Sequence, residues 1–481
     1  MVAALHELFP IPSLPPSTIS PARLPGISPE STTALQQVLQ DNHEKWHIFY
    51  NEKGFLNHIA HHVLANWALG ANGRIIRAAY ERATTSQRPA LERSGSITAA
   101  NFNQHFCDER YYPAYLEFAK TEIRSKGFAV VLEDWVFSIK ANFVDEVDQP
   151  QPEMLSRFLA SLLHPLIHVG YGLEFGLCGV LAEGLAQIPA HTAETSNLLP
   201  RLFFDRKYPP VPLSDGVHAF TVLARILKDP DFNLENVSID RKNPMAAYQY
   251  VERHHADAIR NHAERWAFDV FDPKNLERKI EELVWVNTII YAAPGWKQGR
   301  PFRADFFFMH FVTSSIFLSS IAAYLSPKSQ ELLLRAYFCV CITTFIARGR
   351  PNLDITSFFT ETEEIPKPPH GSCARPSETA LAGASADAAL PNPWPSILLN
   401  SIVHPDDHLP KLQRALAHYS AIYGSRHAGL PDFTSTELAG ADKLDGSLFV
   451  RVAELTATSL GRVYDGEEKT GAWVRKDFIG E

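Results

Sequence analysis

Helical periodicity in the apolar residues is the feature of this sequence that most limits its fold. In most segments the apolar residues recur at intervals of three and four, which would place them on one face of an α-helix, and strict alternation is rare. The segments are 75–81, 115–125, 154–163, 219–227, 246–267, 276–291 and 409–423. The best candidate for a β-strand is the short run 127–132. The pattern therefore predicts a mostly α-helical protein.

Two segments depart from this periodicity. Residues 1–30 are rich in proline, and between residues 361 and 395 proline, alanine and serine replace the aromatic and branched residues that pack in a core. We expect one large all-helical domain over residues 31–481. A proline-rich segment (1–30) would precede it, and a mobile insertion loop or linker would interrupt it at 361–395.

The charge pattern bears on the partners of the protein. A net charge of −9 and the lack of long basic runs predict no binding to nucleic acid or to an anionic membrane. The five cysteines form no C-x-x-C pair, and the N-terminus lacks a basic stretch followed by an apolar one, so we expect a cytoplasmic protein. The sequence does not predict an oligomeric state.

One uncharged run, 306–325, has almost the length of a membrane-spanning helix, whereas the apolar run 336–347 is too short to span. Serine, threonine and His310 dilute the first run. We therefore expect two buried core helices and no membrane span, since a helix buried in a large α-helical protein is also apolar on every face.

Two histidines lie four residues apart in an apolar stretch, at His164 and His168. On a helix they would be roughly 40° apart, so both imidazoles could face one metal ion, with Tyr171 on nearly the same face. Such a pair also arises by chance in a chain with 20 histidines. The glycines that follow do not have the spacing of a dinucleotide-binding loop, and we expect them to allow close helix packing.

A second pair with this spacing, His58 and His62, flanks His61 near the expected start of another helix. All three could instead be surface or capping histidines. His310 lies among phenylalanines, where a buried imidazole needs a hydrogen-bond partner or a metal. A histidine alone in an apolar helix is more often a hydrogen-bonded core residue.

The segment 404–411 (HPDDHLPK) leads from a turn into a helix. One interpretation is that Asp406 or Asp407 caps the helix, Pro410 lies in its first turn and Lys411 is a solvated surface charge. The other is that Lys411 is buried. A lysine in an apolar site loses its proton readily and becomes a nucleophile that can capture carbon dioxide as an anionic carbamate.

Taken together and in this order, the motifs resemble the questin oxidase-like family of polyketide biosynthesis, over about residues 46–478. The motifs are 57–62 (NHIAHH), 164–175 (HPLIHVGYGLEF), 309–315 (MHFVTSS), 348–351 (RGRP), 404–411 (HPDDHLPK) and 444–451 (LDGSLFVR). The resemblance implies a mostly helical fold and, in some members, a mononuclear non-haem iron held by four histidines and a carboxylated lysine. By motif, the ligands of Fe(II) would be His58, His164, His168, His310 and Lys411, with His62 and the carboxylates of Asp406 and Asp407 as alternatives.

The resemblance also implies an oxygenase that uses molecular oxygen to open a ring of an anthraquinone-like polyketide, by a Baeyer–Villiger or a dioxygenase reaction. His61, His62 and His408 would transfer protons, because imidazole titrates near neutral pH. Tyr171, Phe55 and Phe311 would contact the planar substrate. Two alternatives remain open. One is a metal-free monooxygenase of the same substrates that uses NADPH, and the other is a non-catalytic helical binding protein.

Overall fold

The computed structural model describes residues 7–476 except 53, 146–148, 206–212, 234, 238–241, 268, 270, 367–391 and 464–470. Over these residues the secondary structure is helical, and β-pairing is limited to isolated bridges such as that between Trp46 and Pro89. The prediction of a mostly α-helical protein is confirmed. Most of the predicted insertion at 361–395 lies outside the described residues and stays a prediction.

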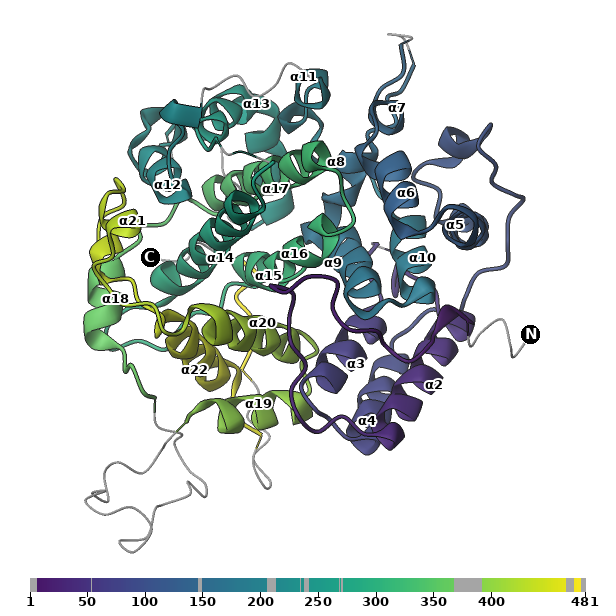
Figure 1. Ribbon diagram of the computed structural model, residues 1–481, viewed down its shortest axis with the longest axis horizontal. Helices are drawn as coiled ribbons and strands as arrows, with labels where there is room; N and C mark the ends of the chain where they lie inside the picture. Colours follow the sequence, from purple (N-terminus) through teal and green to yellow (C-terminus); the bar gives the residue numbers. More distant parts are fainter. Residues whose placement is uncertain are drawn as a thin grey trace, which may run out of the picture.

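Four helices from distant parts of the chain meet near the middle of the molecule (Figure 1). They are α3 (Ile59–Ala68), α9 (Ala160–Phe175), α15 (Phe306–Ser315) and α20 (His408–Tyr423). Helix α9 packs against α3 and α15. Helix α20, from the C-terminal part of the chain, packs against the same two helices. The histidine motifs predicted to bind metal thus lie on or at the start of four helices, each of which packs against two of the others.

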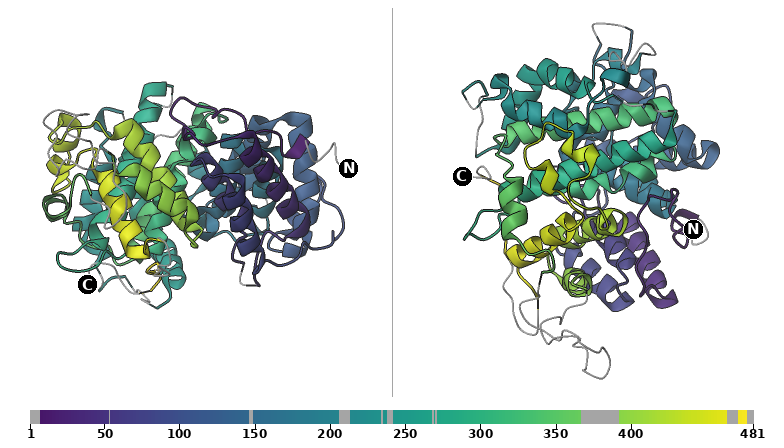
Figure 2. Two further views of the ribbon diagram at one scale, coloured as in Figure 1. Left: turned by 90° about the horizontal axis from the view of Figure 1, so that it is seen from below. Right: turned by 60° about the vertical axis from the view of Figure 1, so that its left-hand side comes forward.

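Other helices surround these four, and the N-terminal and C-terminal groups lie on opposite sides of the molecule (Figure 2). Helices α2 (Pro29–Lys45) and α4 (Gly73–Thr84) cover α3, while α10 (Cys178–Gln187) lies between α9 and α5 (Tyr112–Lys126). Helix α15 packs on α14 (Pro273–Gly295) and on α17 (Pro327–Ala347). Helix α17 in turn contacts α13 (Pro244–Glu264). Helices α19 (Trp394–Val403) and α22 (Leu448–Leu460) cover α20. The shorter helices are α6 (Phe128–Leu132), α7 (Ile139–Asn142), α8 (Met154–Phe158), α11 (Arg201–Phe204), α12 (Ala219–Lys228), α16 (Leu318–Ala322), α18 (Ile355–Glu361) and α21 (Pro431–Thr434).

Two glycines allow α9 to approach its neighbours closely. A Cβ atom on Gly170 would lie 2.5 Å from the side chain of Phe317, and one on Gly172 would lie 2.6 Å from the backbone of Leu181 in α10. Neither distance is compatible with a side chain, because protein interiors are already close-packed. The glycines after His168 therefore serve helix packing, as predicted.

The first turn of α9 is irregular. Ser161, Leu162 and Leu163 all have left-handed backbone angles, with φ between 51° and 66°. This conformation is costly for residues with a Cβ, so other contacts must stabilise it. Glu194 accepts a hydrogen bond from the Ser161 N–H at 2.8 Å, and the ring of His164 is hydrogen-bonded to the Ser161 carbonyl. The turn therefore helps to orient the first histidine of α9.

One local prediction was wrong. The run 127–132 is not a strand: Gly127 has φ of 81° and Phe128–Leu132 forms α6, since a short apolar run has no periodicity that separates helix from strand. The core helix predicted at 306–325 is present but divided into α15 and α16, both buried. However, the described helix that is long and apolar enough to cross a bilayer is α17, which begins well before the apolar run 336–347. Of its most apolar window, 89% is buried inside the protein, as in a core helix.

Candidate metal centre

The structure brings most of the predicted site residues around one small internal cavity. Its volume is about 10 Å³, which is close to the space one water molecule needs. Side chains of α3, α9, α15 and α20 line the cavity, together with Phe317, which follows α15 in the sequence. The lining residues are His61, His164, Ile167, Tyr171, His310, Thr313, Phe317, His408 and Lys411. Of the residues expected to touch a substrate, Tyr171 lines this cavity, Phe311 lines a different cavity, and Phe55 is 48% exposed.

Each of the four histidines predicted to bind metal has one ring nitrogen held by an acceptor. His58 Nδ1 lies 2.9 Å from the Asp407 carboxylate, and His310 Nδ1 lies 2.6 Å from the Phe306 carbonyl. His164 Nδ1 contacts the Ser161 carbonyl, and His168 Nε2 lies 3.1 Å from the Glu183 carboxylate. A neutral imidazole has one N–H, so each ring donates it to this acceptor and keeps a lone pair on the other nitrogen.

Two of these lone pairs face each other. His58 Nε2 and His164 Nε2 are 2.8 Å apart, and the two rings are nearly parallel. Burial and the positive charge of Lys411 lower the pKa of His58 to about 4, and burial together with His58 lowers the pKa of His164 further, so neither ring carries a second proton at neutral pH. Two unprotonated nitrogens at this distance repel each other unless a cation lies beside both. Nitrogens bound to one metal at about 2.1 Å and at a right angle are about 3 Å apart, so this pair has a geometry that fits a metal ion.

His310 presents a nitrogen toward the same cavity. Its Nε2 is buried without a hydrogen-bond partner, and its ring centroid lies 5.0 Å from that of His164. An unpaired polar atom in the core is costly, and a metal ligand is one group that offsets this cost. The alternative of an ordinary hydrogen-bonded core histidine accounts for Nδ1 but not for Nε2.

His168, like His58 and His164, has a partner at each ring nitrogen. Its Nε2 contacts Glu183, and its other ring nitrogen, Nδ1, lies 3.0 Å from His61 Nε2. His61 stacks on Tyr171 with ring centroids 5.2 Å apart, and its own Nδ1 is buried without a partner. His61 is therefore a fifth histidine of the cluster, and it contacts the nitrogen with which His168 would bind a metal. His62 follows one turn after His58 on α3 and is also buried.

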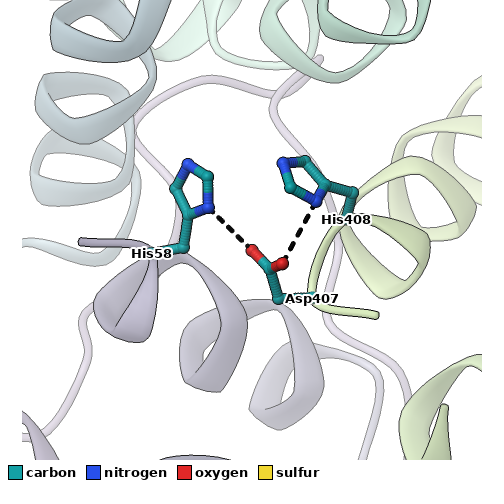
Figure 3. Close-up of side chains that lie close together, drawn as sticks. All are labelled: His58, Asp407 and His408. Atoms are coloured by element: carbon teal, nitrogen blue, oxygen red, sulfur yellow. Dashed lines mark ion pairs between the residues drawn. The ribbon is translucent and has the colours of Figure 1, made fainter. Parts of the chain in front are cut away.

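The start of α20 places Asp407, His408 and Lys411 beside His58. The Asp407 carboxylate contacts His58 Nδ1 at 2.9 Å, His408 Nδ1 at 3.1 Å and Lys411 Nζ at 3.0 Å; Figure 3 shows the two histidine contacts. Burial opposes a charged carboxylate, but His408, Lys411 and His58 hold the pKa of Asp407 well below its ordinary value. Ligand atoms of His58, Asp407 and His408 all lie within 4.8 Å of one another.

Both interpretations of 404–411 are partly right. Asp406 accepts a hydrogen bond from the His408 backbone N–H at 2.8 Å, so it satisfies a donor of the first helical turn. Asp407 occupies the N-cap position, but its side chain makes no capping bond and turns to the histidines instead. Lys411 is 7% exposed, so the expectation of a solvated surface charge is wrong.

Two carboxylates that contact the histidines were not predicted in these roles. Asp407 was weighed as a cap or an alternative ligand, and Glu183 was not singled out. Glu183 is 3% exposed in α10, and its second oxygen lies 2.6 Å from His43 Nδ1. A glutamate in the apolar stretch 178–187 was the available signal, since a buried carboxylate requires partners.

The fold and this cluster define an all-α protein with several neutral imidazoles, a buried lysine, a buried carboxylate (Glu183) and a half-buried one (Asp407) at its centre. Residues 55–416 match the family described as questin oxidase-like, which is more than half of the chain. The chain therefore belongs to this family, and the resemblance found in its motifs is confirmed.

Curated relatives cover a large part of the chain. A questin oxidase of Aspergillus terreus is 25% identical over 402 residues, which are 81% of this chain and 80% of the relative. The Baeyer-Villiger monooxygenase AacuH of Aspergillus aculeatus is 26% identical over 444 residues, 82% of this chain and 80% of the relative. The Baeyer-Villiger oxidase notM of an Aspergillus species is 34% identical over 166 residues, 34% of each chain. These relatives are named as oxidoreductases.

Proposed function

We propose that this protein is an oxygenase that opens a ring of an anthraquinone-like polyketide in secondary metabolism, and that it does so with a mononuclear non-haem iron. The names of the relatives, questin oxidase and Baeyer-Villiger oxidase, support the reaction class and the kind of substrate. The observation that supports the metal is the pair of His58 and His164, whose unprotonated Nε2 atoms lie 2.8 Å apart. Bound Fe(II) would supply the site that activates molecular oxygen.

The residues proposed to hold the iron are His58, His164, His168, His310 and Lys411. Each histidine is oriented by an acceptor on its other nitrogen, an arrangement that raises the basicity of a metal ligand. In the state described here, the Lys411 amine pairs with Asp407. Carboxylation of Lys411 would replace this cation by an anion and break the pair, so Asp407 is the competing source of a carboxylate ligand.

The remaining polar residues of the cavity would act on the substrate and its protons. His61, His408 and Tyr171 line the cavity, so they can contact a bound phenol or quinone, whereas His62 is not among its lining residues. Thr313 and Phe317 complete walls that exclude water. A volume of about 10 Å³ does not admit a tricyclic substrate, so substrate binding requires the surrounding helices to move apart.

The test combines metal analysis with turnover. We expect the purified protein to contain or bind one iron per chain, and to consume an anthraquinone-type substrate together with oxygen, observed as loss of its long-wavelength absorbance. His164→Ala should abolish both iron binding and turnover while the helical circular dichroism stays unchanged. Full activity without iron and with a requirement for NADPH would show the metal-free monooxygenase instead. Failure to convert any such substrate under either condition would favour a binding protein.

A further inference from the structure

We propose that Glu183 is a positioning residue for His168, and that His43 holds Glu183 in place from the outer side. In this arrangement His168 presents Nδ1 to the cluster, whereas the other three histidines present Nε2. The inference rests on the proposed function in so far as the nitrogen presented is meant for a metal.

The geometry is a chain of hydrogen bonds that crosses three helices. Glu183 on α10 uses one carboxylate oxygen for His168 Nε2 at 3.1 Å and the other for His43 Nδ1 at 2.6 Å. His168 lies on α9 and His43 on α2. A carboxylate only accepts hydrogen bonds, so both imidazoles must direct an N–H at it. His168 is therefore protonated on Nε2, and its lone pair is on Nδ1, 3.0 Å from His61 Nε2.

The fold alone does not account for this arrangement. Glu183 is 3% exposed, and its partners are imidazoles rather than a lysine or an arginine. Burying a carboxylate is costly, and an apolar residue of similar size in the same place is often as stable or more stable. Neither partner carries a permanent positive charge, unlike lysine or arginine, so the Glu183 carboxylate is an anion in the core without a fixed counter-ion. A metal cation beyond His168 would be stabilised by that charge, and the carboxylate would strengthen the donor nitrogen through the imidazole ring.

The position of His43, at the outer end of this series of hydrogen bonds, is also fixed by its neighbours. His43 forms part of the wall of a surface groove of about 440 Å³, and its side chain is 7% exposed. The ring packs edge-on against Phe9, which is fully buried, with ring centroids 5.3 Å apart. This contact limits rotation of the His43 ring and so keeps its Nδ1 directed at Glu183.

The first experiment measures metal affinity of the full-length protein after removal of bound metal, with Co²⁺ as the probe and its visible spectrum as the readout. We expect Glu183→Ala to weaken Co²⁺ binding by about 10 to 100-fold, and His168→Ala to weaken it as well. The double variant should bind no more weakly than His168→Ala, because Glu183 acts through His168. Additive losses, or an unchanged affinity in Glu183→Ala, would overturn the proposal.

The controls separate this effect from general damage to the fold. Glu252→Gln removes the charge of another buried carboxylate, which accepts hydrogen bonds from Asn197 rather than from a histidine of the cluster, and should leave Co²⁺ affinity unchanged. Should Glu183→Ala not fold, Glu183→Gln keeps the shape but offers one acceptor oxygen to two imidazoles. It should also weaken binding.

The second experiment reads the tautomer directly and needs no metal. In protein labelled with ¹⁵N-histidine, the signal lost in His168→Ala identifies His168, and we expect its proton on Nε2. In Glu183→Ala that preference should disappear, whereas a proton on Nδ1 in the wild type would refute the inference. A Co²⁺ affinity that does not change in His164→Ala would instead contradict the proposed metal centre, and the tautomer then decides the role of Glu183 by itself.

Discussion

His58 Nε2 and His164 Nε2 lie 2.8 Å apart although neither ring has a proton to share at neutral pH. The residues are 106 positions apart in the chain and come from α3 and α9. Their other nitrogens are held by Asp407 and by the Ser161 carbonyl, so neither ring can turn away without losing a hydrogen bond. The fold thus holds the two lone pairs close together, and binding of the proposed cation would relieve their repulsion.

This relationship predicts that His58 and His62 differ in metal binding. His58→Ala should lower Fe²⁺ affinity at least about tenfold, because it removes a nitrogen that faces His164. His62→Ala is the matched control on the same helix and should change the affinity much less. Competition with a coloured chelator measures both. Equal losses in the two variants would show that His62 is also a ligand.

Lys411 gives a second prediction. If its amine is carboxylated when iron binds, removal of bicarbonate should weaken Fe²⁺ binding to the wild type, and addition of bicarbonate should restore it. Lys411→Met should bind weakly with or without bicarbonate. Lys279, another buried lysine paired with a carboxylate, provides the control, and Lys279→Met should keep the bicarbonate response. Wild-type affinity that is independent of bicarbonate would assign the anionic ligand to Asp407.

Asp305 should matter for stability because it caps α15 and neutralises Arg348. It accepts the N–H groups of Phe307 and Phe308 at 2.8 Å, and its second oxygen lies 2.5 Å from Arg348 Nη2, with both side chains buried. Asp305→Asn should lower the free energy of unfolding by about 3–5 kcal/mol, since the buried Arg348 loses its ion pair with Asp305. Asp354→Asn, at the exposed N-cap of α18, should cost only a few tenths of a kcal/mol because asparagine caps as well as aspartate. Urea denaturation measures both, and similar losses would contradict the argument.

Buried histidines should make the protein sensitive to mild acid. Burial, with a smaller effect of Arg157, lowers the pKa of His191 to about 4 from an ordinary value of 6.5. Between these two values the unfolded chain takes up a proton that the folded protein does not. The stabilisation is therefore complete above pH 6.5 and is lost as the pH falls toward 4, by about 1.4 kcal/mol per pH unit. His191→Gln should flatten this part of the pH profile of unfolding by that amount, and an unchanged slope would refute the assignment.

The left-handed turn before His164 predicts a stabilising substitution. Ser161 has φ of 51°, a conformation that glycine adopts at no steric cost. Ser161→Gly should leave the free energy of unfolding unchanged or raise it by up to about 1 kcal/mol, whereas Ser161→Val should lower it. Both variants keep the backbone groups that contact Glu194 and His164. A clear loss of stability in the glycine variant would show that the turn depends on the serine side chain.

Much of the fold and part of the site could be predicted from the sequence because they depend on local patterns. Periodicity identified the helices, and the spacing of His164 and His168 placed both on α9. The strand predicted at 127–132 was wrong because a short apolar run fits either a helix or a strand. Local pattern also gave no way to choose the acceptor of each imidazole. Asp407 looked like a helix cap and Glu183 like one residue of an apolar helix, since their contacts with His58 and His168 exist only after helices pack.

The small volume at the centre has a kinetic consequence. A chamber with room for a single water molecule keeps its reactive groups out of reach of solvent and of any aromatic guest for as long as the four helices stay closed. Under the proposed function, turnover of a large planar molecule would then depend on how often this interior opens. The turnover rate should follow the frequency of that breathing motion more closely than the strength of any bond being broken.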